Sequence, residues 1–262
     1  MYTLLTVFGF AVIFIATSLG AALVFIFKND VSERLNALFL GVSAGIMLAA
    51  SIWSLLLPSI DGAVEDYGAL SFIPAVIGFI AGGFFIVLID KLVPNFIVEC
   101  NDGAETKTAV LLKPVKTFIA ITVHNIPEGL AVGFAFGAAA VIGTYSAYIS
   151  ALGLAVGIAI QNFPEGAAVS LPLKRATKST GKSFLLGVVS GAVEPVAAVI
   201  GYFLASALSK AQPWFLAFAA GAMIFVVAED LIPDAKTDKP HLGSWGVMAG
   251  FAVMMLLDVA LG

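Results

Sequence analysis

The chain has 262 residues, of which 60% are hydrophobic and 11% charged, and its mean hydropathy is +1.05. Soluble domains carry about 25% charged residues, so this composition excludes a soluble globule and a disordered chain, while one cysteine excludes a disulfide scaffold. The net charge of −4, with scattered basic residues, argues against nucleic-acid binding. The class that remains is an integral membrane protein, with one transmembrane domain over 1–262.

Eight apolar stretches follow one another along the chain. Each is long enough for the roughly 20 residues that a helix needs to span a bilayer, and none alternates like a membrane strand. The first stretch lacks the basic start and the small-residue cleavage site of a signal peptide, so we expect it to be a retained helix. The sequence therefore predicts an all-α membrane protein with helices over 3–27, 36–57, 69–90, 116–141, 146–173, 183–207, 213–233 and 243–261, and a loop over 91–115.

Lys and Arg residues indicate the orientation of these helices. The segments that follow the first, third, fifth and seventh stretches carry 12 of the 13 basic residues, and Lys210 is the exception. Basic residues concentrate in cytoplasmic loops of membrane proteins. We therefore expect both termini outside the cytoplasm and the 91–115 loop inside it.

Two pairs of stretches share sequence patterns. IAGGFFIVLID ends at Asp90 and MAGFAVMMLLD ends at Asp258, while AGIM leads to Pro58 and AGAM leads to Pro233. The members of each pair run in opposite directions in the predicted topology. Unless chance alone explains these matches, the chain is a 3+2+3 inverted repeat around 116–141 and 146–173, an arrangement typical of transporters with a midplane site.

The two central stretches carry matching hexamers, His-Asn-Ile-Pro-Glu-Gly from His124 and Gln-Asn-Phe-Pro-Glu-Gly from Gln161. In each hexamer the first residue and the glutamate are four apart, so they lie on one helix face. Each proline removes a backbone N–H at membrane depth, which is tolerated where the backbone is satisfied by neighbours or lines a cavity. An ordinary proline kink explains neither the repeated asparagine nor the repeated glutamate.

Three carboxylates lie near the middle of their spans, namely Glu128, Glu165 and Glu194, and no Lys or Arg lies there with them. A charge at the centre of a membrane helix costs at least about 2.5 kcal/mol. The acids are therefore either protonated or arranged around a cation. Carboxylate and amide oxygens alone suit Mg²⁺, Ca²⁺ or Mn²⁺, whereas the imidazole of His124 shifts the preference toward Zn²⁺, Fe²⁺ or Mn²⁺, and Met47 is a candidate soft ligand.

These residues resemble the ZIP family of divalent-metal transporters, in particular its GufA-type branch, and the resemblance covers the whole chain. It implies import of Zn²⁺, and also of Fe²⁺, Mn²⁺ or Cd²⁺, into the cytoplasm by alternating access, with the metal as cargo and no prosthetic group. It also implies a two-metal centre. The first site would use His124, Glu128, Gln161, Glu165 and Met47, and the second would use Asn125, Glu128, Asn162, Glu165 and Glu194. Some relatives have Asp in place of Asn162, so the second site of this chain carries less negative charge.

Four further acids are candidates for the route of the metal. Asp61 and Asp258 lie at outer helix ends, where they would attract cations, unless they are simply solvated end charges. Glu229 and Asp230 lie at the inner end of 213–233 and resemble the pair that receives metal on the cytoplasmic side in the family.

Other functions and settings remain open at this point. A cation-selective metal channel needs the same midplane site as a carrier. An intramembrane metallohydrolase would need several His ligands and an open metal position, yet the chain has two His and no H-E-x-x-H motif. The expected partners are divalent metal ions and the lipid bilayer. The family also suggests a homodimer, and the short loops suggest a prokaryotic plasma membrane.

Overall fold

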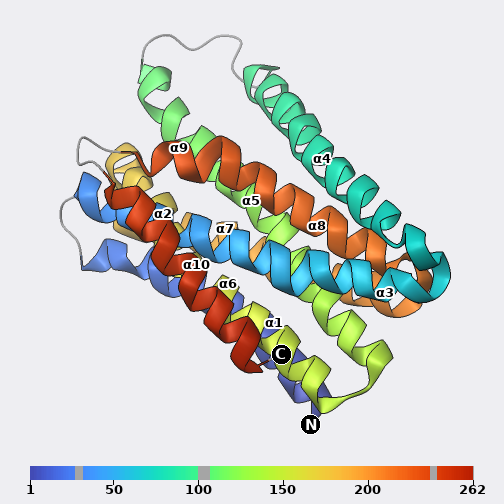
Figure 1. Ribbon diagram of the computed structural model, residues 1–262. Coiled ribbons are helices and arrows are strands. Elements are labelled where there is room, and N and C mark those ends of the chain that lie inside the picture. The colour runs from blue at the N-terminus through green and yellow to red at the C-terminus, as the bar shows by residue number, and fades with distance from the viewer. Residues whose placement is uncertain (27–31, 100–106, 237–240, 262) are drawn as a thin grey trace.

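The computed structural model describes residues 1–26, 32–99, 107–236 and 241–261, and Figure 1 shows these as a bundle of long helices. Eight of the helices in these ranges are long and apolar enough to cross a membrane, which confirms the predicted all-α, eight-span architecture. The spans are formed by α1 (Tyr2–Ala21) with η1 (Ala22–Phe25), α2 (Glu33–Ala50) with η2 (Ser51–Leu56) and α3 (Leu57–Tyr67), α4 (Phe72–Glu99), α5 (Lys107–Ile142), α6 (Tyr145–Thr177), α7 (Thr180–Ala207), α8 (Gln212–Val226) with η5 (Val227–Leu231) and α9 (Ile232–Asp234), and α10 (Leu242–Leu261).

Several helix ends differ from the prediction. The expected loop over 91–115 is mostly helical, because α4 continues to Glu99 and α5 begins at Lys107. Hydropathy marks where a helix leaves the membrane, but the backbone hydrogen bonds of a helix can continue beyond that point. The second span also continues past Leu57 to Tyr67, so Pro58 does not end it.

Pro58 is accommodated by a π-helical turn. The turn η2 ends at Leu56, and Pro58 then lies in the first turn of α3, a position at which helices tolerate proline. The turn η5 ends at Leu231 and is followed in the same way by Pro233 in α9. Figure 1 shows α3 and α9 at opposite ends of the molecule, so the two π-helical turns occupy equivalent places in an inverted repeat.

Helix pairing follows the same repeat. The most extensive contacts join α1 to α6, α5 to α7, α2 to α10, and α4 to α8. The inverted repeat exchanges the first three spans with the last three, and α5 with α6. Under this exchange the α1–α6 pair becomes the α7–α5 pair, and the α2–α10 pair becomes the α8–α4 pair. The packing is therefore that of a 3+2+3 inverted repeat.

These pairs form two groups of helices. We call α1, α5, α6 and α7 the site unit, and the four spans that contain α2, α4, α8 and α10 the support unit. Within the site unit the backbones approach closely at glycines. A methyl group at Gly129 would lie 2.3 Å from the Glu194 carbonyl oxygen, and one at Gly166 would lie 2.0 Å from the Thr17 carbonyl oxygen. Small residues allow this close approach of membrane helices.

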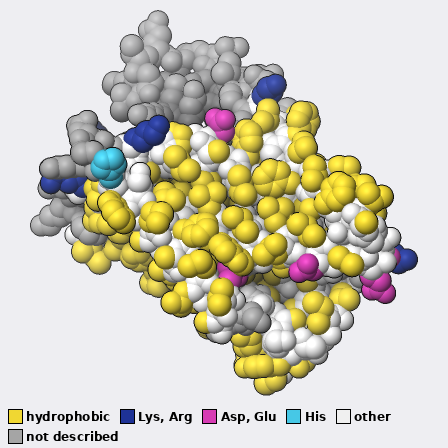
Figure 2. All heavy atoms as spheres, viewed as in Figure 1, with side chains coloured by type: hydrophobic (Ala, Val, Ile, Leu, Met, Phe, Trp, Pro, Cys, Tyr) yellow, Lys and Arg dark blue, Asp and Glu magenta, His cyan; other side chains and the backbone are white. Residues whose placement is uncertain are grey.

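The outer surface of the bundle is apolar. Figure 2 shows hydrophobic side chains over most of the visible face, with Lys and Arg at the ends of the bundle. On α4, for example, Ile80 and Phe84 are 65% and 68% exposed, as expected for side chains that face lipid. Both termini lie at the same end of the molecule, as an even number of spans requires (Figure 1). That this end is extracytoplasmic stays a prediction from the basic residues.

Candidate metal centre

The two hexamers place their polar side chains in the interior of the bundle. Both α5 and α6 remain helical through Pro127 and Pro164. The predicted ligands Asn125, Glu128, Gln161, Asn162 and Glu165 are all buried, and so is Glu194 on α7. Side chains of this kind are rarely buried in a membrane helix without a functional reason.

Glu194 lies at the meeting point of three helices. Its Oε1 accepts a hydrogen bond of 2.9 Å from the Thr17 hydroxyl of α1. Its Oε2 accepts another from the Asn162 Nδ2 of α6. The same Nδ2 also donates to the Ile13 carbonyl oxygen at 3.3 Å. The carboxylate of α7 is thus held by donors from α1 and α6.

Several buried acceptor atoms near Glu194 have no hydrogen bond within the described residues. The Asn125 Nδ2 donates to the Ser190 carbonyl oxygen at 3.0 Å, but its Oδ1 has no donor. The same holds for the Oδ1 of Asn162 and the Oε2 of Glu128. Buried polar atoms without a partner cost about 1–3 kcal/mol each unless a ligand or water satisfies them. A divalent cation is a group that oxygen atoms of this kind can bind.

The three glutamates interact without forming a closed cluster. Glu165 and Glu194 both lie close enough to Glu128 for their charges to repel. The side-chain amide of Gln161 also approaches Glu128, although in no hydrogen bond of normal geometry. Across the described ranges, no group of three His, Cys, Asp or Glu side chains is arranged to hold a metal ion. The buried polar side chains gathered here are carboxylates and amides.

His124 faces the support unit. Its Nε2 lies 3.5 Å from the Oδ2 of Asp230 on η5, and the Asp230 side chain is 47% exposed. A predicted ligand and a predicted exit residue are thus brought together at the boundary between the two units. Glu229, the neighbouring exit candidate, is exposed.

Met47 lies on the face of α2 that packs toward α6. Met47 is buried. Ser43, one helical turn earlier, donates a hydrogen bond of 3.4 Å from its hydroxyl to the Gln161 carbonyl oxygen. This placement agrees with a ligand contributed by the support unit. The thioether would be the soft member of a set otherwise made of oxygen and nitrogen atoms.

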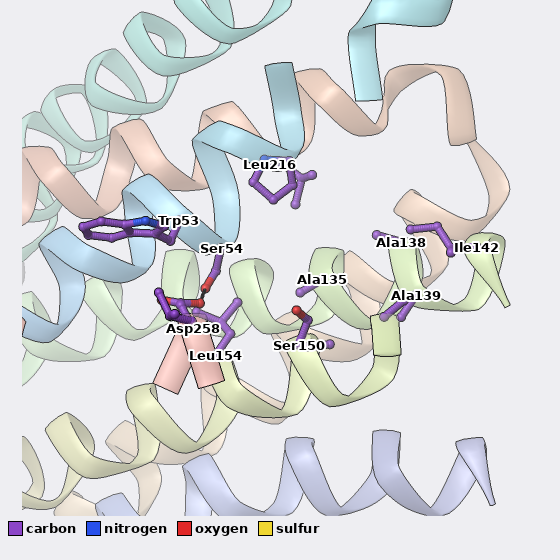
Figure 3. Close-up of a pocket in the computed structure, with 14 residues that line it drawn as sticks. Trp53, Ser54, Ala135, Ala138, Ala139, Ile142, Ser150, Leu154, Leu216 and Asp258 are labelled. Atoms are coloured by element: carbon purple, nitrogen blue, oxygen red, sulfur yellow. Dashed lines mark hydrogen bonds between the residues drawn. The ribbon is translucent and has the colours of Figure 1, made fainter. Parts of the chain in front are cut away.

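Asp258 lies away from the hexamers, in a pocket of about 370 Å³ between the two units (Figure 3). It accepts a hydrogen bond from the Ser54 hydroxyl of η2, and its Oδ2 is buried without a partner among the described residues. The wall facing these residues comes from α5 and α6, including Ala135 and Ser150. Asp61, the other entrance candidate, is exposed on α3 and does not line this pocket.

Thr17 and Ser190 contribute to the centre, although the sequence does not single them out. Thr17 also contacts the Ile13 carbonyl oxygen at 3.2 Å, the bond expected of any threonine in a membrane helix. Serine and threonine are common in membrane helices, so the sequence does not distinguish Thr17 or Ser190 from the other serines and threonines of the spans. Only the packing of α1 and α7 against the hexamers reveals their contacts.

Comparison with known proteins gives consistent matches. A family model described as ZIP zinc transporter matches residues 101–258. The chain is 36% identical to zinc transporter ZIP11 of Homo sapiens, over 94% of this chain and 94% of that protein. It is 37% identical to zinc transporter ZIPB of Bordetella bronchiseptica, over 98% of this chain and 81% of that protein. It is 32% identical to zinc transporter GufA of Myxococcus xanthus, over 94% and 95% of the two chains.

Proposed function

This chain belongs to the ZIP family of metal transporters, and from that membership we propose that Zn²⁺ is its main cargo and that the metal crosses the membrane at the centre between α5, α6 and α7. The protein is a multi-pass membrane protein that imports divalent metal ions and is not an enzyme, so the metallohydrolase alternative is set aside. Fe²⁺, Mn²⁺ and Cd²⁺ are proposed as further cargo.

We propose a two-part ligand set for the metal. The first position uses nitrogen, oxygen and sulfur atoms, and the second uses oxygen atoms only, with two glutamates shared. The observation that carries this proposal is the group of buried acceptor atoms without donors on Asn125, Asn162 and Glu128. The first position would comprise His124, Glu128, Gln161, Glu165 and Met47, and the second Asn125, Glu128, Asn162, Glu165 and Glu194.

Alternating access would arise from movement between the two units. The site unit carries every proposed ligand except Met47. Its contacts with the support unit include the stacked rings of Phe134 and Phe215, with centroids 5.3 Å apart, and the His124–Asp230 pair. Asp258 and the adjoining pocket would form part of the outer route, with Asp61 near its start, and Asp230 and Glu229 would receive metal at the inner side. Movement of the whole site unit would expose the same ligands to each side in turn.

The proposal also covers the domain, its orientation, its membrane and its oligomeric state. The chain acts as one transmembrane domain over 1–262, with both termini outside the cytoplasm. The similar proteins come from both bacteria and vertebrates, so they do not favour the expected prokaryotic plasma membrane over another membrane. A homodimer is likewise a proposal that rests on the family.

Metal selectivity tests this assignment. We expect purified protein in proteoliposomes to take up Zn²⁺, Mn²⁺, Fe²⁺ and Cd²⁺ with saturable kinetics, while a hundredfold excess of Mg²⁺ neither enters nor inhibits. The physical reason is that an imidazole and a thioether favour transition metals over Mg²⁺, which prefers oxygen ligands and retains its water. A chelating dye inside the vesicles measures the uptake.

The matched control for this experiment is His124→Ala. Loss of the imidazole should narrow the preference for Zn²⁺ over Mg²⁺, because the remaining ligands are mainly oxygen atoms. Inhibition of the unaltered protein by Mg²⁺ as strong as that by Zn²⁺ would contradict the proposed ligand set. Uptake that never saturates with metal concentration would favour the channel.

A further inference from the structure

Thr17 of α1 is held in one place between the two helices that carry the acids. A methyl group at Gly191 of α7 would lie 2.8 Å from the Thr17 Cβ, and one at Gly166 of α6 would lie 2.0 Å from the Thr17 carbonyl oxygen. Thr17 is itself buried. With glycines on both sides and no space around it, the threonine hydroxyl has a fixed position relative to Glu194.

The hydroxyl is directed to the carboxylate. The Thr17 Oγ1 lies 2.9 Å from the Glu194 Oε1, closer than the 3.2 Å that separates it from the Ile13 carbonyl oxygen. The Asn162 Nδ2 donates a hydrogen bond to the other carboxylate oxygen, Oε2. Both oxygens of Glu194 therefore already accept hydrogen bonds from fixed donors.

Glu194 differs in this respect from other members of the proposed second position. Asn125, Asn162 and Glu128 each present a buried acceptor atom without a donor, and these atoms are available to a cation at no loss of a hydrogen bond. Each carboxylate oxygen has a second lone pair, so a cation can bind Glu194 while the Thr17 hydroxyl and the Asn162 amide keep their hydrogen bonds. Hydrogen bonds to a charged group are the stronger ones in proteins, so these two donors fix the orientation in which the carboxylate meets the cation.

We propose that Thr17 is a positioning residue that, together with Asn162, orients Glu194 for the second metal, so that loss of the Thr17 hydroxyl weakens the second binding step about tenfold. The inference rests on the proposed function, because it assumes that the metal binds at this centre. It assigns to α1 a part in setting how many ions the centre holds. The first metal binds to residues that Thr17 does not touch.

Zn²⁺ titration of the purified full-length chain tests the proposal, with Thr17→Val and Thr17→Ser as a matched pair. Valine keeps the branched shape against Gly191 and loses the hydroxyl, whereas serine keeps the hydroxyl. We expect two binding steps in the unaltered protein. In Thr17→Val the second dissociation constant should rise about tenfold, and the first should stay within about twofold. Thr17→Ser should behave like the unaltered protein.

Thr17→Ala is the second variant, for the case in which Thr17→Val does not fold as judged by gel filtration and circular dichroism. It also lacks the hydroxyl, so the second step should weaken by about tenfold. An unchanged or tighter second step in the folded variants, an equal change in Thr17→Ser, or no second step in any variant would overturn the proposal. Glu128→Ala distinguishes failure of this proposal from failure of the proposed function. Loss of the Glu128 carboxylate should weaken the first binding step. A first step that is unchanged in this variant would count against the metal centre itself.

Discussion

Replacing Glu128 by alanine is expected to reduce Zn²⁺ uptake by roughly a hundredfold or more. Glu128 is buried near the middle of its span, lies close to Glu165 and Glu194, and belongs to both proposed metal positions. Loss of a residue that only supports a metal ligand already costs about 10–100-fold in affinity or activity, and loss of a direct ligand costs more. The measurement is initial-rate uptake by proteoliposomes that contain equal amounts of protein.

The control for this prediction is Glu65→Ala. Glu65 is an exposed glutamate on α3, outside the bundle interior. Its loss removes the same charge from the chain and should leave uptake within about twofold, because exposed charges interact weakly with a distant site. Uptake that survives Glu128→Ala with only a small change in rate would show that the metal takes another path.

Linking the two units together is expected to stop transport. Phe134 on α5 and Phe215 on α8 stack across the boundary with ring centroids 5.3 Å apart and planes tilted by 14°. Cysteines in place of both, in a Cys100→Ser background, would lie within reach of a short bifunctional thiol reagent. If the site unit moves past the support unit, the covalent link holds one access state, and uptake should fall to the level of empty vesicles.

The reducible form of the reagent provides the control. Uptake by the unlinked double-cysteine protein should be close to that of the unaltered protein, and cleavage of the link should restore it. A second link, between Tyr2→Cys and Tyr148→Cys, lies within the site unit, where the two rings stack with centroids 4.4 Å apart. This link should leave transport largely intact if the unit moves as a rigid body. Transport that persists with Phe134 and Phe215 linked would rule out movement at this boundary.

The membrane architecture and the central acids are predictable from the sequence for a common reason. Apolar residues fill the spans so uniformly that Glu128, Glu165 and Glu194 differ sharply from their surroundings. The cost of placing a charge at membrane depth makes each of them informative without knowledge of the fold. The repeated hexamers then bring two of the acids to equivalent places on α5 and α6.

Local backbone geometry is not predictable in the same way. The predicted span 36–57 ends just before Pro58, yet the π-helical turn η2 is followed by α3, which continues the span to Tyr67. The hydrogen-bond shift that forms such a turn leaves no mark in hydropathy, and it depends on the packing of the whole span. The repeat of the same feature at η5 becomes visible only in the structure.

Contacts between distant segments also require the structure. His124 and Asp230 are each notable in the sequence, but nothing in it pairs them across the unit boundary at 3.5 Å. Thr17 carries no signal, because a buried threonine that bonds its own helix is ordinary in a membrane span. Its bond to Glu194 results from the close packing of α1 against glycines on α6 and α7.

X-ray absorption at the zinc edge, on purified protein loaded with one equivalent of Zn²⁺, tests most directly whether the midplane residues bind the metal. The proposed centre predicts nitrogen and oxygen ligands at about 2.0–2.1 Å and a longer sulfur contact from Met47, with the outer scattering of one imidazole that disappears in His124→Ala. It also predicts that replacing Glu128 and Glu165 together by glutamine changes the ligand shell. A spectrum of hydrated zinc, or one that is the same in all three proteins, would contradict metal binding at this centre.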